Sequence, residues 1–254
     1  MTMRKILFLL FPILFIAVVT FLFSDASALA QSMNIDLGKS TSGTATAKLI
    51  QLVVLLTVIS LAPSILVMTT SFMRIVIVLS FLRSALGLQQ TPPNQVLISL
   101  ALFLTAFIMA PAFEKSYNDG VKPLLEEKIS EEKALELIGE PFHEFMLKHV
   151  RQKDLELFVS MSPNLKIEEA EDTPYRVLIP AFMISELKRS FEIGFLIFIP
   201  FVVIDMLVAS ILMAMGMMML PPVMISLPFK LIFFVLVDGW YMICGSLIKS
   251  FGTV

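Results

Sequence analysis

The feature that most limits how this chain can fold is the segment from Ile193 to Phe229, where 37 consecutive residues carry a single charge, that of Asp205. A helix needs about 20 apolar residues to cross the hydrocarbon core of a bilayer, so this segment is longer than one simple span. Three further runs are of the same kind: Leu49–Met73, Val96–Phe113 and Leu231–Ile248. The sequence therefore predicts an all-α membrane protein with four hydrophobic segments.

Composition agrees with this fold class and separates one region from the rest. The chain is 57% hydrophobic and 16% charged, whereas soluble domains carry about 25% charged residues. Residues 114–189 hold 16 of the 21 acidic and 11 of the 19 basic residues, a net charge of −5. We expect a soluble block there. A net charge of −2 without a basic patch gives no indication of nucleic-acid binding.

The first 30 residues have the three parts of a secretory signal peptide. Arg4 and Lys5 precede an apolar run of 18 residues, and Ala28 and Ala30 follow in the A-x-A spacing of a cleavage site. The sequence predicts cleavage after Ala30, although an apolar run of this length also suits an uncleaved anchor.

Prolines and the methionine stretch interrupt the apolar runs. Pro63 lies inside the first run, where proline kinks a helix. The third and fourth runs are separated by the methionine stretch and by PPVMISLPFK. In the soluble block, apolar residues at intervals of three and four predict short amphipathic helices, with a boundary at 139–141 because proline suits the first turn of a helix.

If all four hydrophobic segments span the membrane, the soluble block lies on the same side as the mature N-terminus. The predicted organisation is a signal peptide (1–30), a flexible polar lead-in (31–48), a first hydrophobic helical pair (49–113), a small soluble periplasm-side helical block (114–190) and a second hydrophobic helical pair with a methionine loop (191–254).

Two carboxylates occur within apolar segments, where an ionised group is energetically unfavourable. An ionised Asp at the centre of a spanning helix costs roughly 2.5–3.5 kcal/mol, so Asp205 is expected to face protein and to find a cation, with Lys230 and Arg74 as candidates. Asp238 precedes Trp240 and Tyr241 and has two open interpretations, a position near the lipid headgroups or a packed interior one.

Other residue types indicate no reaction centre. Cys244 is alone and is expected to be a small buried hydrophobe. His143 and His149 lack metal-ligand spacing and are expected on the surface. No nucleophile and base stand at a useful spacing, so we expect no enzymatic activity, no metal and no cofactor.

The stretch MAMGMMMLPP, residues 213–222, holds five methionines within seven residues and then two prolines. Flexible, apolar thioether side chains can seal against many partners, but they can also be ordinary lipid-facing or core filler. Thioethers also select copper(I), so a methionine-rich copper(I) membrane transporter is the alternative function, although neither His nor Cys accompanies the cluster.

Two long segments resemble one family. Pro180–Leu247, with the run VVIDMLVASILMAMGMMMLPPVMISLPFKL, is similar to the FliP family of the bacterial flagellar type III secretion apparatus. Thr70–Phe113, beginning TSFMRIVIV, resembles the N-terminal half of that family. The resemblance covers nearly the whole mature chain. Virulence-type relatives tend to be shorter and to lack a signal peptide, so the flagellar branch is favoured.

The resemblance implies a core subunit of the flagellar protein export channel, located in the bacterial inner (cytoplasmic) membrane within the flagellar basal body. Five copies would assemble with FliQ and FliR, and with FlhB and FlhA nearby, around a closed pore that unfolded flagellar substrates enter. It implies hydrophobic segments that form bent helical hairpins, in agreement with the proline breaks, and buried charges important for assembly at Asp205, Lys230 and Arg74. It also implies a pore gasket formed by Met213, Met215, Met217, Met218 and Met219.

Overall fold

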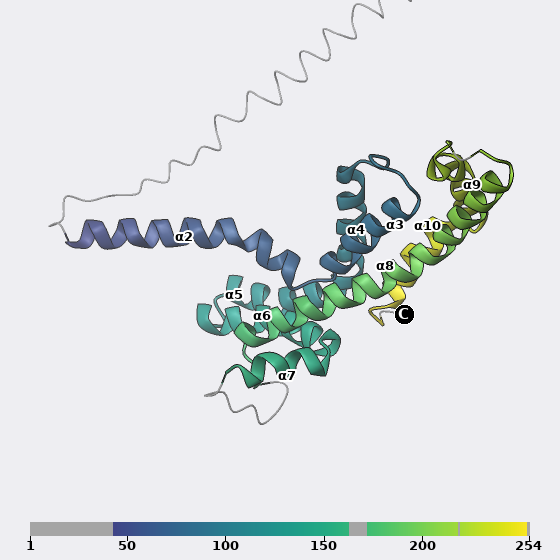
Figure 1. The fold of residues 1–254 in the computed structure, drawn as a ribbon. Helices are drawn as coiled ribbons and strands as arrows, with labels where there is room; N and C mark the ends of the chain where they lie inside the picture. Colours follow the sequence, from purple (N-terminus) through teal and green to yellow (C-terminus); the bar gives the residue numbers. More distant parts are fainter. Residues whose placement is uncertain (1–42, 163–171, 218, 253–254) are drawn as a thin grey trace, which may run out of the picture. The chain divides into compact units, whose positions relative to one another are not determined.

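The computed structural model describes residues 43–162, 172–217 and 219–252, and every regular element in these ranges is helical (Figure 1). The all-α prediction is therefore confirmed. The predicted signal peptide with Ala28 and Ala30, most of the predicted lead-in, and Met218 lie outside these ranges. The chain divides into two compact units, residues 1–58 and 59–254, and the packing below is that of the second.

In chain order the elements are α2 (Gly43–Met68), α3 (Phe72–Ala85), α4 (Asn94–Ser116), the π-helical turn η2 (Tyr117–Val121), α5 (Lys122–Leu125), α6 (Glu131–His149), α7 (Gln152–Ser160), α8 (Tyr175–Ala214), α9 (Pro222–Leu236) and α10 (Gly239–Lys249).

The first apolar run, with its continuation beyond Arg74 from Ile75 to Leu82, forms two helices, so the predicted first helical pair consists of three helices. α2 begins at Gly43, inside the predicted lead-in, and continues through Pro63. The break comes at Thr69, Thr70 and Ser71, all buried. The Thr69 hydroxyl donates to the carbonyl of Ile65 at 3.0 Å. Short hydroxyl side chains that bond to nearby backbone groups compete with helix continuation, which accounts for a break here.

α3 lies at the centre of the apolar packing, between α4 and α8. Its buried residues Ile75, Val78 and Leu79 share a core with Leu97 and Ile108 of α4. On its other side, a glycine of α8 allows a close approach, since a Cβ atom at Gly194 would collide with the ring of Phe81. Small residues allow membrane helices to approach closely, and Gly194 has that role here.

α8 is one helix of 40 residues, about 60 Å long at 1.5 Å per residue. It passes Pro180 and Pro200 without interruption and begins inside the region expected to be the soluble block. Leu178 and Phe182, near its start, form a buried cluster with Met146 of α6. The helices of the block therefore share a core with the helix that enters the second apolar pair.

The predicted helix boundary at residues 139–141 is wrong. α6 runs continuously from Glu131 to His149, with Pro141 inside it. Proline removes the helical hydrogen bond to the carbonyl four residues earlier. The carbonyl left without its helical donor is that of Leu137. The next carbonyl, that of Ile138, accepts a hydrogen bond from Ser116 Oγ of α4 at 2.8 Å, so α4 is bonded to α6 at the turn that contains the proline.

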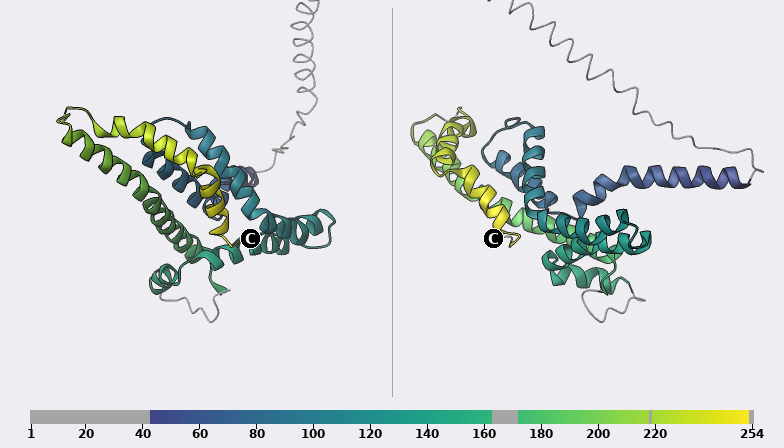
Figure 2. Two further views of the ribbon diagram at one scale, coloured as in Figure 1. Left: turned by 90° about the vertical axis from the view of Figure 1, so that its right-hand side faces the viewer. Right: turned by 180° about the vertical axis from the view of Figure 1, so that it is seen from behind.

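The second apolar pair is a hairpin in which α9 and α10 return alongside α8 (Figure 2). PPVMISLPFK, expected to be a separator, forms the first half of α9 with Pro221 as its N-cap. α9 and α10 meet at a bend of 62°, where Asp238 has a left-handed conformation with φ of 50°.

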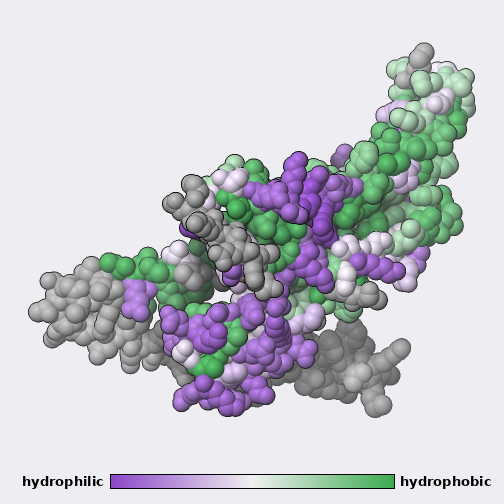
Figure 3. Space-filling model, turned by 90° about the horizontal axis from the view of Figure 1, so that it is seen from below, coloured by the Kyte–Doolittle hydropathy of each residue, from purple (hydrophilic) through white to green (hydrophobic). Residues whose placement is uncertain are grey.

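Within the described ranges, three helical stretches are long and apolar enough to cross a membrane: Ile50–Met68, Asn94–Leu125 and Tyr175–Ala214. The bent pair α9–α10 gives a fourth if it is counted as one span. Figure 3 shows hydrophobic side chains covering the end formed by α9 and the C-terminal half of α8, with hydrophilic ones gathered over the region of α5–α7. The described helices therefore fit a membrane protein with three or four spans.

Candidate functional site

The methionine stretch lies between α8 and α9, and hydrogen bonds fix its backbone where α8 ends. Gly216 takes a left-handed conformation with φ of 74°. The amide of Gly216 donates to the carbonyl of Met213 at 3.0 Å, and that of Met217 donates to Leu212 at 2.9 Å. These two bonds form a Schellman motif, which ends helices at a left-handed glycine. Pro221 and Pro222 then start α9, so both ends of the turn are defined by sequence.

The described methionine side chains of this turn point away from the core. Met213, in the last turn of α8, and Met215 are each 61% exposed, and Met219 is 99% exposed. Met217 is 43% exposed. An apolar groove of about 410 Å³ between α8 and α9 includes Met215 in its lining. The described methionines are thus flexible apolar side chains exposed around a helix end whose backbone is held by hydrogen bonds.

Asp205 and Lys230, from the two arms of this hairpin, form an ion pair. Lys230 Nζ donates to Asp205 Oδ2 at 2.6 Å, and the side chains are 4% and 29% exposed respectively. Ser226 Oγ donates to the other carboxylate oxygen at 2.5 Å and is fully buried. Both oxygens of a carboxylate deep in an apolar segment are therefore satisfied from α9.

Lys230 also reaches a third helix. Its ammonium group lies 3.3 Å from the carbonyl oxygen of Ala85, the last residue of α3. The final carbonyls of a helix lack helical partners and carry partial negative charge, so a cation is favourable there. One lysine thus connects α8, α9 and the C-terminal end of α3.

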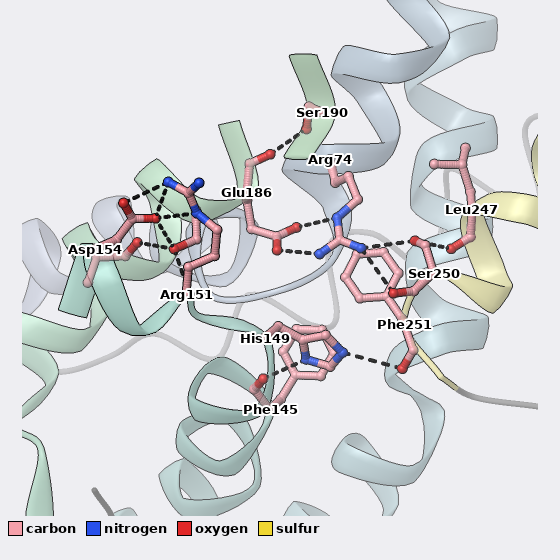
Figure 4. Close-up of polar contacts among 12 residues, drawn as sticks. Arg74, Phe145, His149, Arg151, Asp154, Glu186, Ser190, Leu247, Ser250 and Phe251 are labelled. Carbon is pink, nitrogen blue, oxygen red and sulfur yellow. Dashed lines mark hydrogen bonds and ion pairs between the residues drawn. The ribbon is translucent and has the colours of Figure 1, made fainter. Parts of the chain in front are cut away.

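Arg74 does not contact Asp205; it pairs with Glu186 of α8 (Figure 4). Arg74 Nε donates to Glu186 Oε2 at 2.8 Å, and Nη2 donates to Oε1. Both side chains are at most 1% exposed. Nη1 donates to Ser250 Oγ at 2.9 Å and to the Ser250 carbonyl at 3.3 Å, while the guanidinium carbon lies 3.7 Å from the centroid of the Phe251 ring. A buried, bidentate pair therefore also holds the turn that follows α10.

His149 belongs to the same cluster, so the prediction of a surface histidine is wrong for this residue. It is 5% exposed and packs against the rings of Phe145 and Phe251. Its Nδ1 lies 2.7 Å from the carbonyl of Phe145, and Nε2 lies 3.3 Å from that of Phe251. Burial lowers the pKa of His149. The two carbonyl contacts raise it and the positive charge of Arg74 lowers it, and the net shift is downward. The neutral ring, which can donate to only one carbonyl, is therefore favoured.

A second polar cluster joins α7 to α8. Asp154 receives hydrogen bonds from Arg151 Nε at 2.8 Å and from Ser185 Oγ at 2.6 Å. Burial raises the pKa of Asp154, but the hydrogen bonds from Ser185 and Arg151 more than offset this, so the net shift is downward. Within the described ranges no three of His, Cys, Asp and Glu converge as a metal site would require.

Sequence reasoning missed Glu186 and Ser226. Glu186 lies among the charges of the predicted soluble block, where nothing distinguishes it from exposed neighbours such as Lys188 and Glu192. Ser226 lies four residues before Lys230, a spacing that places both on one face of a helix, and this was the available signal. Cys244, expected to be buried, is partly exposed.

Comparison with known proteins gives one consistent result. The family model described as the FliP family matches residues 55–247. Flagellar biosynthetic protein FliP of Caulobacter vibrioides is 62% identical over 227 residues, covering 89% of this chain and 85% of the relative. The protein of the same name from Bacillus subtilis is 59% identical over 202 residues, covering 80% and 91%. That from Aquifex aeolicus is 50% identical over 204 residues, covering 80% and 85%.

Proposed function

Because the chain belongs to the FliP family, and is thus a membrane-associated component of the flagellar export apparatus, we propose that it is a core, non-enzymatic subunit of the flagellar type III export channel. In this proposal several copies, five by family resemblance, assemble with FliQ and FliR and with FlhB and FlhA nearby. The assembly sits in the inner membrane at the flagellar basal body, with the α5–α7 region on the periplasmic side. Unfolded flagellar proteins pass through its pore.

The observation that carries the proposal is the methionine turn. Its described side chains are exposed in the single chain, apolar and unbranched, and they stand on a backbone held by a Schellman motif. In a ring of copies, such turns can meet at the axis and close the pore against ions. Methionine adapts its shape and carries no charge, so the same ring can yield to many different substrate chains.

The Asp205–Lys230 pair supports this use of the turn. It lies in the arms of the hairpin that bears the methionines and ties both arms to the end of α3. A seal needs its side chains flexible but its backbone fixed. We propose that the pair supplies this fixed backbone and that Arg74 does the same for the other end of α3.

The test is ion leakage across the membrane. Changing Met213, Met215, Met217, Met218 and Met219 together to alanine is expected to increase leakage, because the short side chains cannot close the pore. The matched control is Met206→Ala with Met224→Ala, since these methionines lie on α8 and α9 outside the turn and are also exposed, at 65% and 66%. Wild-type leakage in the turn variant, or equal leakage in the control, contradicts the seal. The copper(I) alternative has no support from the relatives, which are named flagellar biosynthetic proteins.

A further inference from the structure

Apart from the groove beside the methionines, an apolar groove of about 390 Å³ lies between α8 and α10. It is lined by Ile193, Leu196 and Ile197 of α8 and by Met242, Ile243, Ser246, Leu247 and Ser250 of α10 and the turn after it. α10 returns alongside α8 (Figure 2), and Ile193 packs against the buried cluster that contains Leu247. The start of the apolar part of α8 therefore lies beside the end of α10.

Polar contacts identify the residues at this end of the groove. Ser250 Oγ accepts a hydrogen bond from Arg74 Nη1 at 2.9 Å, and Arg74 pairs with Glu186 of α8 (Figure 4). Arg189 follows Glu186 by three residues, which is about one helical turn. It lies near enough to Arg74 for the two positive charges to interact. The buried pair therefore places Ser250 and Arg189 at the same end of the groove.

Two cations at this end, Arg189 and Lys249, have no acidic partner. Neither side chain makes a hydrogen bond or ion pair within the described ranges, and both are at least partly exposed. Arg189 precedes Ile193 by four residues, and Lys249 follows Ser246 by three. Residues at these spacings are neighbours on a helix surface, so each cation lies on the face that lines the groove. These two residues define the cationic end of the groove.

The carboxylates nearby on α8 are already paired. Both oxygens of Glu186 accept hydrogen bonds from Arg74. Glu192 pairs with Lys188 at 3.5 Å. The charge of the cationic end is therefore not balanced by these groups, and this end attracts an anion from outside the chain.

The cationic end is also where the apolar segments end. Charged residues resume at Glu192 on one side of the hairpin and at Lys249 on the other. The boundary between the hydrocarbon core and the lipid headgroups is expected at such a position. Basic pockets between membrane helices bind anionic headgroups. The Ser246 hydroxyl makes no hydrogen bond within the part of the chain that the structure describes, so it is a further donor there.

We propose that the α8–α10 groove binds an anionic phospholipid, with one acyl chain between the helices and the phosphate group at Arg189 and Lys249. Arginine binds phosphate oxygens with paired donors, and lysine adds a point charge. A zwitterionic lipid brings its own cation to this end and is disfavoured. A membrane presents acyl chains and anionic headgroups together and in excess, so a lipid suits this groove better than a second copy of the chain. The inference rests on the membrane location and not on the pore.

The chain carries its own reporter for this test. Trp240 is its single tryptophan, is 39% exposed, and precedes the groove residue Ile243 by three positions. It therefore lies beside the end of the groove that an acyl chain would reach. The probes are phosphatidylglycerol and phosphatidylcholine with the same brominated acyl chains, because bromine quenches tryptophan fluorescence at short range. Each is added to the full chain, purified in detergent in the assembly that it forms.

Phosphatidylglycerol is expected to quench Trp240 at about tenfold lower concentration than phosphatidylcholine, since two basic side chains favour its headgroup. Arg189→Gln with Lys249→Gln is expected to abolish this difference. The matched control is Lys153→Gln with Arg176→Gln, which removes the same charge from exposed positions on α7 and in the first turn of α8. The control is expected to keep the difference.

Equal quenching of the wild-type chain by the two lipids overturns the proposal, and so does an equal loss of the difference in both double variants. Absence of quenching by either lipid also overturns it and is the result expected if a second copy or another protein covers the groove. If the double variant at the cationic end does not fold, Ser246→Phe replaces it, because the ring fills the groove and leaves both cations in place. Unchanged quenching by phosphatidylglycerol in Ser246→Phe contradicts the proposal. Ion leakage is not a readout here, so failure of the lipid site leaves the export-channel proposal standing.

Discussion

Arg74 and Glu186, 112 residues apart in sequence, form a bidentate ion pair at the α3–α8 interface with almost no solvent access. Removing one member of such a pair leaves an unpaired charge in the interior. We therefore expect Glu186→Ala to lower the free energy of unfolding by about 3–5 kcal/mol. The change is measured by chemical or thermal unfolding in detergent.

The same helix provides the control for this prediction. Glu192 pairs with Lys188 at 3.5 Å, and both side chains are more than half exposed. Glu192→Ala is expected to cost at most about 1 kcal/mol. Arg74→Met with Glu186→Leu should be less destabilising than Glu186→Ala, because no charge remains buried. Equal effects of the Glu186 and Glu192 changes would contradict a structural role for the buried pair.

Substitutions of Asp205 and Ser226 should differ in how strongly they impair assembly and export. Asp205→Ala leaves Lys230 without its carboxylate, and we expect loss of assembly or of export, read out as loss of swimming. Ser226→Ala removes one hydrogen bond to that carboxylate, a loss of about 1.5–3 kcal/mol, and should weaken both activities without abolishing them. Ser226→Thr keeps the hydroxyl and serves as the control. Normal motility of the Asp205→Ala strain would refute the prediction.

Gly194 should tolerate no side chain unless Phe81 is also changed. A Cβ atom there would overlap the Phe81 ring, so Gly194→Ala must push α8 away from α3. We expect a loss of about 1–3 kcal/mol, the usual cost of overpacking a core. Phe81→Leu in the same chain should recover part of it. A stable Gly194→Ala single variant would show that the two helices can separate without cost.

Replacement of Gly216 by another residue should be limited by backbone conformation rather than by lack of space. A Cβ atom on this residue would meet no other atom within 4 Å, but φ is +74°. Gly216→Ala is therefore expected to cost about 1–2 kcal/mol through left-handed strain, with increased leakage if the turn shifts. Gly245 also has open space around it but no positive φ, so Gly245→Ala is the matched control. Equal stability of the two variants would rule out strain as the cause.

His149 should make stability depend on pH. Its pKa is lowered on folding, chiefly by burial, so the unfolded chain binds a proton at a higher pH than the folded one. Below about pH 6.5 protonation favours the unfolded state, so stability should fall as the pH decreases through this range. His149→Phe keeps an aromatic ring between Phe145 and Phe251 and should reduce the slope. An unchanged slope in that variant would assign the dependence to other groups.

The sequence alone determined the fold class and the family, because both depend on patterns of residues that are contiguous in the chain. The lengths of the apolar runs predict spanning helices through the thickness of a bilayer. The glycine and the two prolines of the methionine stretch mark the end of one helix and the start of the next. These are local properties, and they do not depend on which helix packs against which.

Only the tertiary structure decided which charges meet. From sequence, Arg74 and Lys230 were equal candidates for Asp205, and Glu186 looked like one of many surface acids. The structure assigns Lys230 to Asp205 and Arg74 to Glu186. It also continues α6 through Pro141 and places His149 in the interior. The physical reason is common to these cases: the free energy of a buried charge, ring or carbonyl depends on partners that are brought close by packing and are distant along the chain.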